Sequence, residues 1–393
     1  MQFQTADALK RLPEQFFARL VGKVTAAVRA GHDVINLGQG NPDQPTPPHI
    51  VEALKRAADN PEFHRYSPFR GHAFLKNAVC EFYRREYGVT LDPEREVAVL
   101  FGGKTGLVEI AQCFLNPGDT ALVPDPGYPD YWSGIAMAGG RMEMMPLREE
   151  NEFLPDYRSI PETVRKSAKL MFLNYPNNPT GAVASRDFFR DTVEWASEHG
   201  ILVVHDFAYG AIGFDGKKPV SFLEIPGAKE TGIEIYTLSK TFNMAGWRVG
   251  FAVGNPSVIE VINLIQDHYY VSLFGAVQAA AAEALLGPQD CVRDLVNLYE
   301  RRRNAFIGTL RASGWDVKPP AGSFFCWLPV PEGHSSESFA DLLLEKARVA
   351  VAPGIGFGNA GEGFVRVGLL TDESRLAEAA QRMTRLGLFE KIR

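Results

Sequence analysis

The stretch EIYTLSKTFNMAGWRVGFAVG (234–254) places a lysine and an arginine on either side of a tight turn that contains glycine. The flanking runs EIYTLS (234–239) and WRVGFAVG (247–254) are short and apolar, which predicts two buried strands. A lone lysine is usually a solvated surface group. Lys240, however, stands between an apolar strand and a turn, so we expect it to be partly buried.

Four more apolar runs of the same kind precede this stretch, and segments of helical length separate them. They are EVAVLFG (96–102), TALVPDP (120–126), AKLMFLNYP (168–176) and ILVVHDF (201–207). Short runs rich in Val, Ile and Leu that alternate with helices are typical of buried, mostly parallel strands. The sequence therefore predicts an α/β fold, with a large domain whose mostly parallel sheet is flanked by helices.

The two ends of the chain predict a second, smaller domain. Residues 6–30 are expected to form an opening helix, and residues 36–49 a Pro-rich extended segment. After Gly287 and Pro288, helices and strands alternate in the pattern of an α+β domain. We expect three segments: 1–47 as an N-terminal helix and segment that joins the small domain, 48–286 as the large ligand-binding domain, and 287–393 as the small domain.

Composition excludes several classes of protein. The 393 residues are 45% hydrophobic and 22% charged, as in ordinary globular enzymes. The net charge is −6, so the overall field favours neither nucleic acid nor an anionic membrane as a partner. The four cysteines form no CxxC pair and no zinc-ligand cluster, which indicates buried thiols in a reducing compartment. Without a signal-peptide pattern or a long apolar run, we expect a cytoplasmic enzyme.

Polar residues follow several of the predicted strands, where ligands of open α/β sheets bind. The segment GGKTG (102–106) opens a helix, and its glycines and free N–H groups suit an anion, although a plain tight turn is an equally good interpretation. Asp206 ends a strand in HDFAYG (205–210), where a buried carboxylate needs a cationic partner. Asn178 follows another strand in NYPNNPTG (174–181), where it is either functional or simply part of a turn.

Together these residues indicate one cofactor. A desolvated lysine amine has a lowered pKa and can attack a carbonyl to form an imine. The planar fork of Arg248 suits a phosphate, and Thr237 and Ser239 offer hydroxyls beside Lys240. An imine-forming lysine, a phosphate site and a buried aspartate predict pyridoxal 5′-phosphate, an aldehyde whose ring nitrogen needs a carboxylate.

At this point the chain resembles the fold-type I, pyridoxal-phosphate-dependent aminotransferases of class I/II, nearly from end to end. The motifs that carry the resemblance, in the order of the family, are GQGNPD (38–43), YSPFRG (66–71), GGKTG (102–106), PDPGYPDY (124–131), NYPNNPTG (174–181), DFAY (206–209), SKTFNMAGWRVG (239–250), PGIGFG (353–358) and FVRVG (364–368). The resemblance implies a large sheet of the seven-stranded type and a small domain that is built from both ends of the chain.

The resemblance also implies a role for each matching residue around the cofactor ring. Lys240 matches the lysine that binds the cofactor aldehyde and later moves the substrate's proton. Asp206 matches the carboxylate that pairs with the ring nitrogen. Tyr209 and Asn178 match the pair that hydrogen-bonds the ring oxygen O3′, and Tyr128 matches the aromatic side chain that stacks on the ring.

The implied phosphate and carboxylate sites draw on other motifs. The phosphate site would comprise the backbone of Gly103, Lys104 and Thr105 with the side chains of Thr237, Ser239 and Arg248. Tyr66 matches a residue that reaches the phosphate of the other subunit's cofactor, so the resemblance implies a homodimer with shared active sites. Arg366 matches the arginine that grips the substrate α-carboxylate, with the Gly40 backbone nearby, and its binding could draw the small domain closed.

Specificity is predicted from the segment INLIQDHYYVSLFGAVQ (262–278), which contains no Arg or Lys. We therefore expect a neutral, apolar or aromatic side-chain pocket, in which His268, or Lys104 if it turns inward, is the available cation. Phe16 and Phe17 either add a wall to that pocket or simply pack on a helix face. The segments RLPEQFFARL (11–20), GHDVINLGQGNPDQPTP (31–47) and VLFGGKTGLVE (99–109) most resemble methionine-salvage aminotransferases, which convert 4-methylthio-2-oxobutanoate to methionine.

Other functions stay open at this stage. The same scaffold supports a C–S β-lyase, a decarboxylating relative, or an aminotransferase specific for aspartate or kynurenine. A cofactor-binding transcription regulator would need a DNA-binding module, for which the first 30 residues are too short and not basic enough. A nicotinamide dehydrogenase is disfavoured because no GxGxxG follows a strand at the right place.

Overall fold

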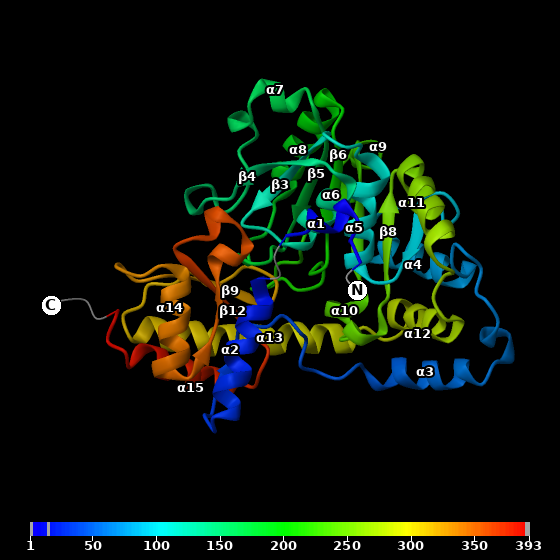
Figure 1. The fold of residues 1–393 in the computed structure, drawn as a ribbon. Coiled ribbons are helices and arrows are strands. Elements are labelled where there is room, and N and C mark those ends of the chain that lie inside the picture. The colour runs from blue at the N-terminus through cyan, green and yellow to red at the C-terminus, as the bar shows by residue number, and fades with distance from the viewer. Residues whose placement is uncertain (1–2, 14–15, 390–393) are drawn as a thin grey trace.

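The structure is a computed structural model that describes residues 3–13 and 16–389, and its largest element is a seven-stranded sheet (Figure 1). Its strands are β2 (Val97–Leu100), β3 (Thr120–Asp125), β4 (Arg141–Pro146), β5 (Ala168–Asn174), β6 (Leu202–Asp206), β7 (Gly232–Thr237) and β8 (Gly250–Gly254). They are arranged in the order β2-β8-β7-β6-β5-β3-β4. Of these seven strands, β8 alone runs in the opposite direction to the other six, which confirms the predicted mostly parallel sheet.

Strand β4 was not among the apolar runs that predict strands. It forms an edge of the sheet, and most of its side chains are exposed, with Met142 at 40% and Met144 at 36%. An edge strand that is not covered on both faces carries no continuous apolar run, so the pattern that predicts central strands misses it.

Helices cover both faces of the sheet, because strand side chains alternate between the two faces. One face packs on α5 (Gly103–Phe114), α6 (Asp130–Ala138) and α11 (Pro256–Tyr269). The other packs on α4 (Ala73–Tyr87), α8 (Arg186–His199) and α12 (Gly275–Leu286), and α3 (Pro48–Ala58) contacts α12. The short helices α7 (Glu162–Arg165), α9 (Ala228–Thr231) and α10 (Leu238–Thr241) lie in connections between strands. The two cores hold the carboxyl ends of the parallel strands in fixed positions.

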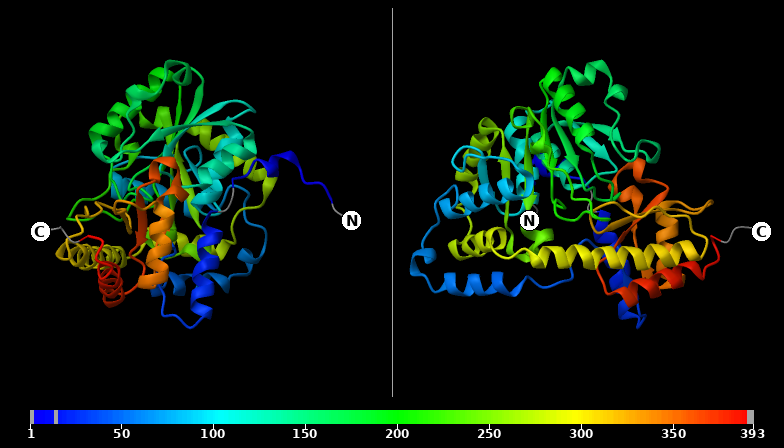
Figure 2. Two further views of the ribbon diagram at one scale, coloured as in Figure 1. Left: turned by 60° about the vertical axis from the view of Figure 1, so that its left-hand side comes forward. Right: turned by 180° about the vertical axis from the view of Figure 1, so that it is seen from behind.

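A smaller unit lies beside the large sheet, at the lower left of Figure 1 and the lower right of the rear view in Figure 2. It contains a three-stranded antiparallel sheet and three helices. These are β9 (Phe325–Pro329), β11 (Ala352–Pro353), β12 (Phe364–Gly368), α13 (Asp290–Ala312), α14 (Ser336–Leu342) and α15 (Glu373–Thr384). Strand β1 (Ile35–Asn36) pairs with β10 (Val349–Ala350), so a segment near the N-terminus joins this unit. The domain boundaries at residues 47 and 286 stay predictions.

The predicted single helix over residues 6–30 is wrong. The chain forms α1 (Asp7–Lys10) and α2 (Phe16–Arg29), and Pro13 lies between them, where a proline disfavours helix in the residue before it. Helix α2 has no buried residue. At its surface, Lys23 pairs with Asp341 at 2.6 Å and Arg19 with Glu337 at 4.0 Å, which ties α2 to α14 of the smaller unit.

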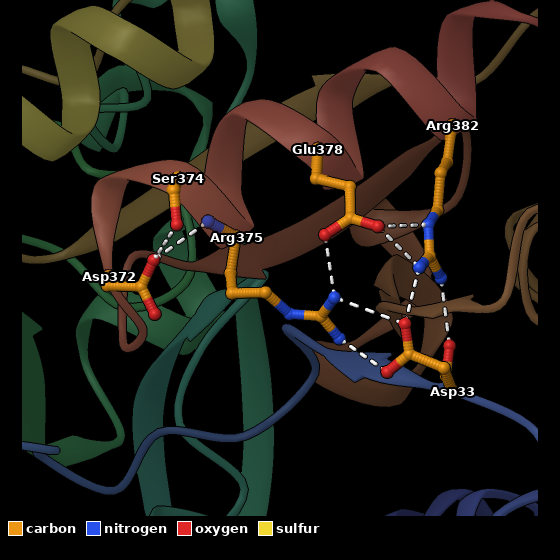
Figure 3. Close-up of polar contacts among 6 residues, drawn as sticks. All are labelled: Asp33, Asp372, Ser374, Arg375, Glu378 and Arg382. Carbon is orange, nitrogen blue, oxygen red and sulfur yellow. Dashed lines mark hydrogen bonds and ion pairs between the residues drawn. The ribbon is translucent and has the colours of Figure 1, made fainter.

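Just beyond α2, Asp33 is held by two arginines of α15 (Figure 3). Its carboxylate accepts hydrogen bonds from Arg375 at 2.7 Å and from Arg382 at 2.5 Å, and Glu378 bridges the same two arginines. These bonds hold the pKa of Asp33 at about 2, well below its ordinary value. Both ends of the connection between α2 and β1 are therefore fixed to the smaller unit.

Among residues 3–13 and 16–389, no helix is long and apolar enough to cross a membrane.

Candidate active site

A cavity of about 480 Å³ lies where the carboxyl ends of β5, β6 and β7 meet the smaller unit. Most of the predicted site residues line it, although they come from motifs far apart in the sequence. These are Gly40, Gly103, Lys104, Tyr128, Asn178, Asp206, Tyr209, Thr237, Ser239, Lys240, Arg248 and Arg366. Phe17 also lines the cavity, whereas Thr105, Tyr66, Phe16 and His268 are not among its lining residues.

Lys240 lies on α10, immediately after β7, and its side chain is largely buried. Its Nζ donates a hydrogen bond to the Gly40 carbonyl oxygen at 3.1 Å. Burial, together with the positive charges of Arg366 and Arg248, lowers the pKa of the amine to about 8, against the opposing effect of Asp206. A substantial fraction of the amine is therefore neutral near physiological pH, which is the form that attacks a carbonyl.

Asp206 is the last residue of β6, and its carboxyl group is buried. Its Oδ2 accepts a hydrogen bond from the Tyr131 hydroxyl at 2.7 Å, and its Oδ1 accepts one from the backbone N–H of Ala208 at 3.2 Å. Burial raises the pKa of Asp206, while the Tyr131 bond and the nearby His205 and Lys240 lower it. These partners hold the carboxylate in one orientation toward the cavity.

Tyr131 was missed by the sequence reasoning. It is fully buried in α6 and stacks on Phe172 with ring centroids 5.0 Å apart. The sequence feature that could have pointed to Tyr131 is its place as the second tyrosine of PDPGYPDY (124–131), three residues after Tyr128. The residue type alone could not show that its hydroxyl reaches Asp206.

A second buried polar group supports the same strand end from the opposite side of the sheet. His205 Nδ1 bonds Glu234 Oε2 at 2.7 Å, and both side chains are fully buried. Glu234 also accepts hydrogen bonds from the hydroxyls of Tyr83 at 2.7 Å and Ser221 at 2.8 Å. The His205 Nε2 contacts the backbone of Tyr175, so this network joins β6 and β7 to the loop that carries Asn178.

Arg366 lies on β12 and is buried. Its guanidinium donates to Asn178 Oδ1 at 2.8 Å and to the Gly38 carbonyl at 2.9 Å, and within the described residues its Nε has no hydrogen-bond partner. Burial lowers its pKa to about 10. The Phe325 and Phe357 rings lie 4.1 and 4.6 Å from the guanidinium carbon.

No acidic side chain pairs with Arg366 in the described part of the chain. A buried cation with neutral partners and a free donor is a ready binding site for a carboxylate.

The loop before α5 forms an anion cradle with the turn after β7. Gly102 has φ +80° and precedes the helix, and a Cβ at this position would lie 2.5 Å from an Arg248 nitrogen. The glycine therefore admits the arginine beside the free N–H groups of the helix start. Thr237 and Ser239, both buried, bond each other through their hydroxyls at 2.9 Å. The group matches a phosphate in charge and donor type.

Two side chains of GGKTG (102–106) do not point into this cradle. The Thr105 hydroxyl donates to the carbonyl of Phe101, just before α5, at 2.9 Å, so it is bonded to the backbone of its own loop. Lys104, which was expected to lend charge if turned inward, pairs with Asp130 at 2.9 Å. Their backbone groups remain candidates for binding an anion.

The aromatic residues complete the cavity. Tyr128 meets Tyr131 edge to face, and Tyr209 packs on Phe324 and Phe325. Burial raises the pKa of both Tyr128 and Tyr209, so both phenols are protonated and can donate hydrogen bonds.

Besides Thr105, three predicted residues do not line the cavity. Tyr66 is 91% exposed, and His268 is also exposed. Phe16 packs against Phe17 and Gly356 rather than lining the cavity. In the described residues there is no group of three or more His, Cys, Asp or Glu side chains that could hold a metal ion.

Comparisons with known proteins agree with this geometry. The family Aminotransferase class I and II matches residues 32–383. The L-glutamine–4-(methylsulfanyl)-2-oxobutanoate aminotransferase of Bacillus subtilis (strain 168) is 68% identical, over 99% of this chain and 98% of that protein. The substrate-bound structure of BacF from Bacillus subtilis is 50% identical with a TM-score of 0.95, over 99% of both chains. A double mutant of Thermus thermophilus aspartate aminotransferase is 31% identical with a TM-score of 0.90, over 98% of this chain and 100% of that chain.

Proposed function

The chain belongs to the class I and II aminotransferases, which use pyridoxal 5′-phosphate, and we propose that its substrates are amino acids and 2-oxo acids with apolar thioether side chains. It is a transaminase of the methionine-salvage type in this proposal. It would transfer an amino group to 4-methylthio-2-oxobutanoate to form methionine, with glutamine or another neutral or aromatic amino acid as donor. The name of the 68% identical relative supports this substrate.

The observation that carries the proposal is the apolar wall of the cavity. Four side chains of α2 line it, namely Phe17, Leu20, Val21 and Val24. An apolar wall stabilises a methylthioethyl side chain by excluding water, and it offers no partner to a charged one. None of residues 262–278 lines this cavity, so the composition of that segment does not bear on it.

The residues of the cavity fit the cofactor. A buried amine at position 240, a buried carboxylate at position 206 and the cradle of Gly102 and Arg248 match its aldehyde, ring nitrogen and phosphate in chemistry. When bound, pyridoxal phosphate supplies a protonated ring that stabilises negative charge at the substrate α-carbon and carries the amino group between two half-reactions. A single cavity would serve both halves, which implies ping-pong kinetics.

Each residue then has a proposed task. Lys240 would hold the cofactor covalently through Nζ and, once released by substrate, move the proton of the substrate α-carbon. Asp206 would keep a proton on the ring nitrogen. Tyr209 and Asn178 would hydrogen-bond the ring oxygen O3′, and Tyr128 would stack on the ring.

The phosphate and the carboxylate have separate proposed partners. The phosphate partners are the backbone N–H groups of Gly103, Lys104 and Thr105 and the side chains of Thr237, Ser239 and Arg248. Arg366 would bind the substrate α-carboxylate as a bidentate pair, beside the Gly40 backbone. Because Arg366 lies in the smaller unit, this contact would favour closure of that unit over the substrate.

We further propose a homodimer in which Tyr66 reaches the cofactor phosphate of the other subunit. Tyr66 is 91% exposed, which supports a contact with a partner, because a tyrosine this exposed has little to stabilise it within its own chain. We also propose a cytoplasmic location, supported by four cysteines that are all free thiols.

A matrix of 2-oxo acids against amino donors tests the proposed substrate. We expect 4-methylthio-2-oxobutanoate to have the highest kcat/KM among 2-oxo acids, and neutral or aromatic donors to exceed aspartate. Formation of the amino acid product must require both substrates. Release of pyruvate and ammonia from a cysteine S-conjugate without any 2-oxo acid would instead identify a C–S β-lyase.

A further inference from the structure

One charged residue of the cavity has a side chain that is not used by the chemistry that all substrates share. Within residues 3–13 and 16–389, the charged residues that line the cavity are Lys104, Asp206, Lys240, Arg248 and Arg366. Four of these have proposed tasks toward the cofactor or the α-carboxylate. Lys104 is the remaining cation, and its side chain is 55% exposed. A free ammonium group here would attract a second carboxylate on a substrate.

Asp130 pairs with this ammonium group. Its Oδ1 lies 2.9 Å from Lys104 Nζ, and its side chain is only 13% exposed. Lys104 lies in the first turn of α5 and Asp130 is the first residue of α6, and these two helices pack against each other (Figure 1). The N-terminus of α6 favours a negative charge, which stabilises Asp130 in its position.

The position of Asp130 links the pair to the cavity. Its carboxylate lies beside the phenol of Tyr128, which itself lines the cavity. The apolar side chains of Leu20 and Val24 on α2 line the same cavity. A distal carboxylate in this cavity would meet these apolar groups and would find Lys104 already neutralised.

We propose that Asp130 determines substrate specificity by neutralising Lys104, so that the cavity rejects dicarboxylic amino acids and 2-oxo acids. The inference rests on the proposed function, because it assigns a residue to the preference for uncharged side chains. Specificity of this kind depends on an unfavourable environment for the wrong substrate as much as on contacts with the right one.

The substitution Asp130→Asn tests the proposal, because asparagine keeps the size of the side chain and removes its charge. Half-reactions of the holoenzyme with L-aspartate, L-glutamate and L-methionine are followed by the loss of near-visible absorbance. We expect the ratio of kcat/KM for the acidic over the neutral substrate to rise about fivefold to tenfold, the size of one part-exposed charge contact.

Lys104→Met and the double variant Asp130→Asn/Lys104→Met are the matched controls. The single Lys104→Met variant should show no rise in the ratio, and the double variant should return to the wild-type ratio. If the acidic-to-neutral ratio stayed high in the double variant, the rise would not come from the charge of Lys104, and the proposal would be wrong. An unchanged ratio in Asp130→Asn would overturn it as well.

Binding of unreactive carboxylates tests the same proposal independently of the reaction rate, in case the variant reacts slowly for another reason. Glutarate and valerate have the same chain length, and only glutarate carries a second carboxylate. We expect Asp130→Asn to tighten glutarate binding relative to valerate by the same factor, as measured by spectral titration. Asp130→Ser, which also suits a helix start, should shift the kcat/KM ratio and the relative glutarate affinity in the same direction. If both variants left these two quantities unchanged, the proposal would be contradicted.

Failure of the proposed function is distinguishable from failure of this inference. If methionine is the wrong substrate, wild-type enzyme will react slowly with L-methionine compared with other neutral amino acids. The shift in the acidic-to-neutral ratio between wild type and Asp130→Asn can still be measured with those neutral amino acids.

Discussion

The floor and the wall of the cavity are built in different ways. The floor consists of strand ends, and its main groups, Asp206 and Asn178, are buried and held by several hydrogen bonds. The wall is α2, which has no buried residue and is held by ion pairs at its surface and by ring contacts such as Phe17 with Phe357. We infer that the floor performs the chemistry common to all substrates and that the wall selects the side chain.

The comparison predicts that changes in the floor lower all rates alike and that changes in the wall alter preference. Lys240→Ala should have the largest effect, a loss of about 10⁴-fold in transfer rate, because both the covalent link and the proton carrier are removed. The near-visible absorbance of the holoenzyme should disappear. An unchanged spectrum and rate in this variant would remove Lys240 from the reaction.

Asp206→Asn should lower the rate by about 10²-fold with every amino acid, because an amide cannot keep a proton on the ring nitrogen. Cofactor affinity, measured by equilibrium dialysis, should fall as well. If methionine and alanine were affected to very different degrees, the floor would be acting in specificity, and the contrast with α2 would be broken.

Tyr131→Phe sharpens the same contrast one step away from the cofactor. Its hydroxyl bond lowers the pKa of Asp206, so its loss should raise that pKa. The acid limb of kcat/KM should then shift to higher pH, with about a tenfold loss of rate below it. Tyr157→Phe is the control, because Tyr157 is also buried but bonds Thr192 instead of Asp206. Equal pH profiles in the two variants would count against a role for Tyr131.

Leu20→Ala tests the wall. We expect kcat/KM for L-methionine to fall about fivefold, with little change for L-alanine, because one shortened apolar side chain removes contact with the thioether. Val28→Ala is the control, since Val28 is on the same helix but is 53% exposed and is not among the lining residues. Equal losses of kcat/KM for both amino acids would mean that α2 does not discriminate between substrate side chains.

Asp33→Asn should have the smallest effect. The pKa of Asp33 is lowered to about 2 by Arg375 and Arg382, so the folded state binds its proton less tightly than the unfolded state, whose value is near 3.8. The stability that Asp33 adds is therefore present above about pH 4 and is lost as the pH falls through about 2. Urea unfolding should show a small difference from wild type at pH 7 that narrows toward acid pH; a constant difference would exclude this origin.

The sequence predicted the site best where a residue type in its motif suits one chemical role. The lysine, aspartate and arginine of three distant motifs meet in one cavity, as the order of those motifs indicated. It was least informative where the function of a residue depends on packing. Tyr131 and Glu234 could be assigned only when the fold brought their partners to them, and strand β4 lacks the apolar run of a central strand.

The split of the opening helix has a local cause instead. Pro13 lies between α1 and α2, and a proline disfavours helix in the residue before it. Lys104 illustrates the limit most clearly. The sequence offered it as a cation for a distal carboxylate, and only the structure shows that Asp130 pairs with it.

The covalent attachment of the cofactor tests the central claim most directly. Holoenzyme is reduced with borohydride, digested with trypsin, and analysed by mass spectrometry. We expect one pyridoxyl phosphate adduct, on Lys240. An adduct on a different lysine, or protein that remains colourless and unmodified after saturation with pyridoxal phosphate, would contradict the account.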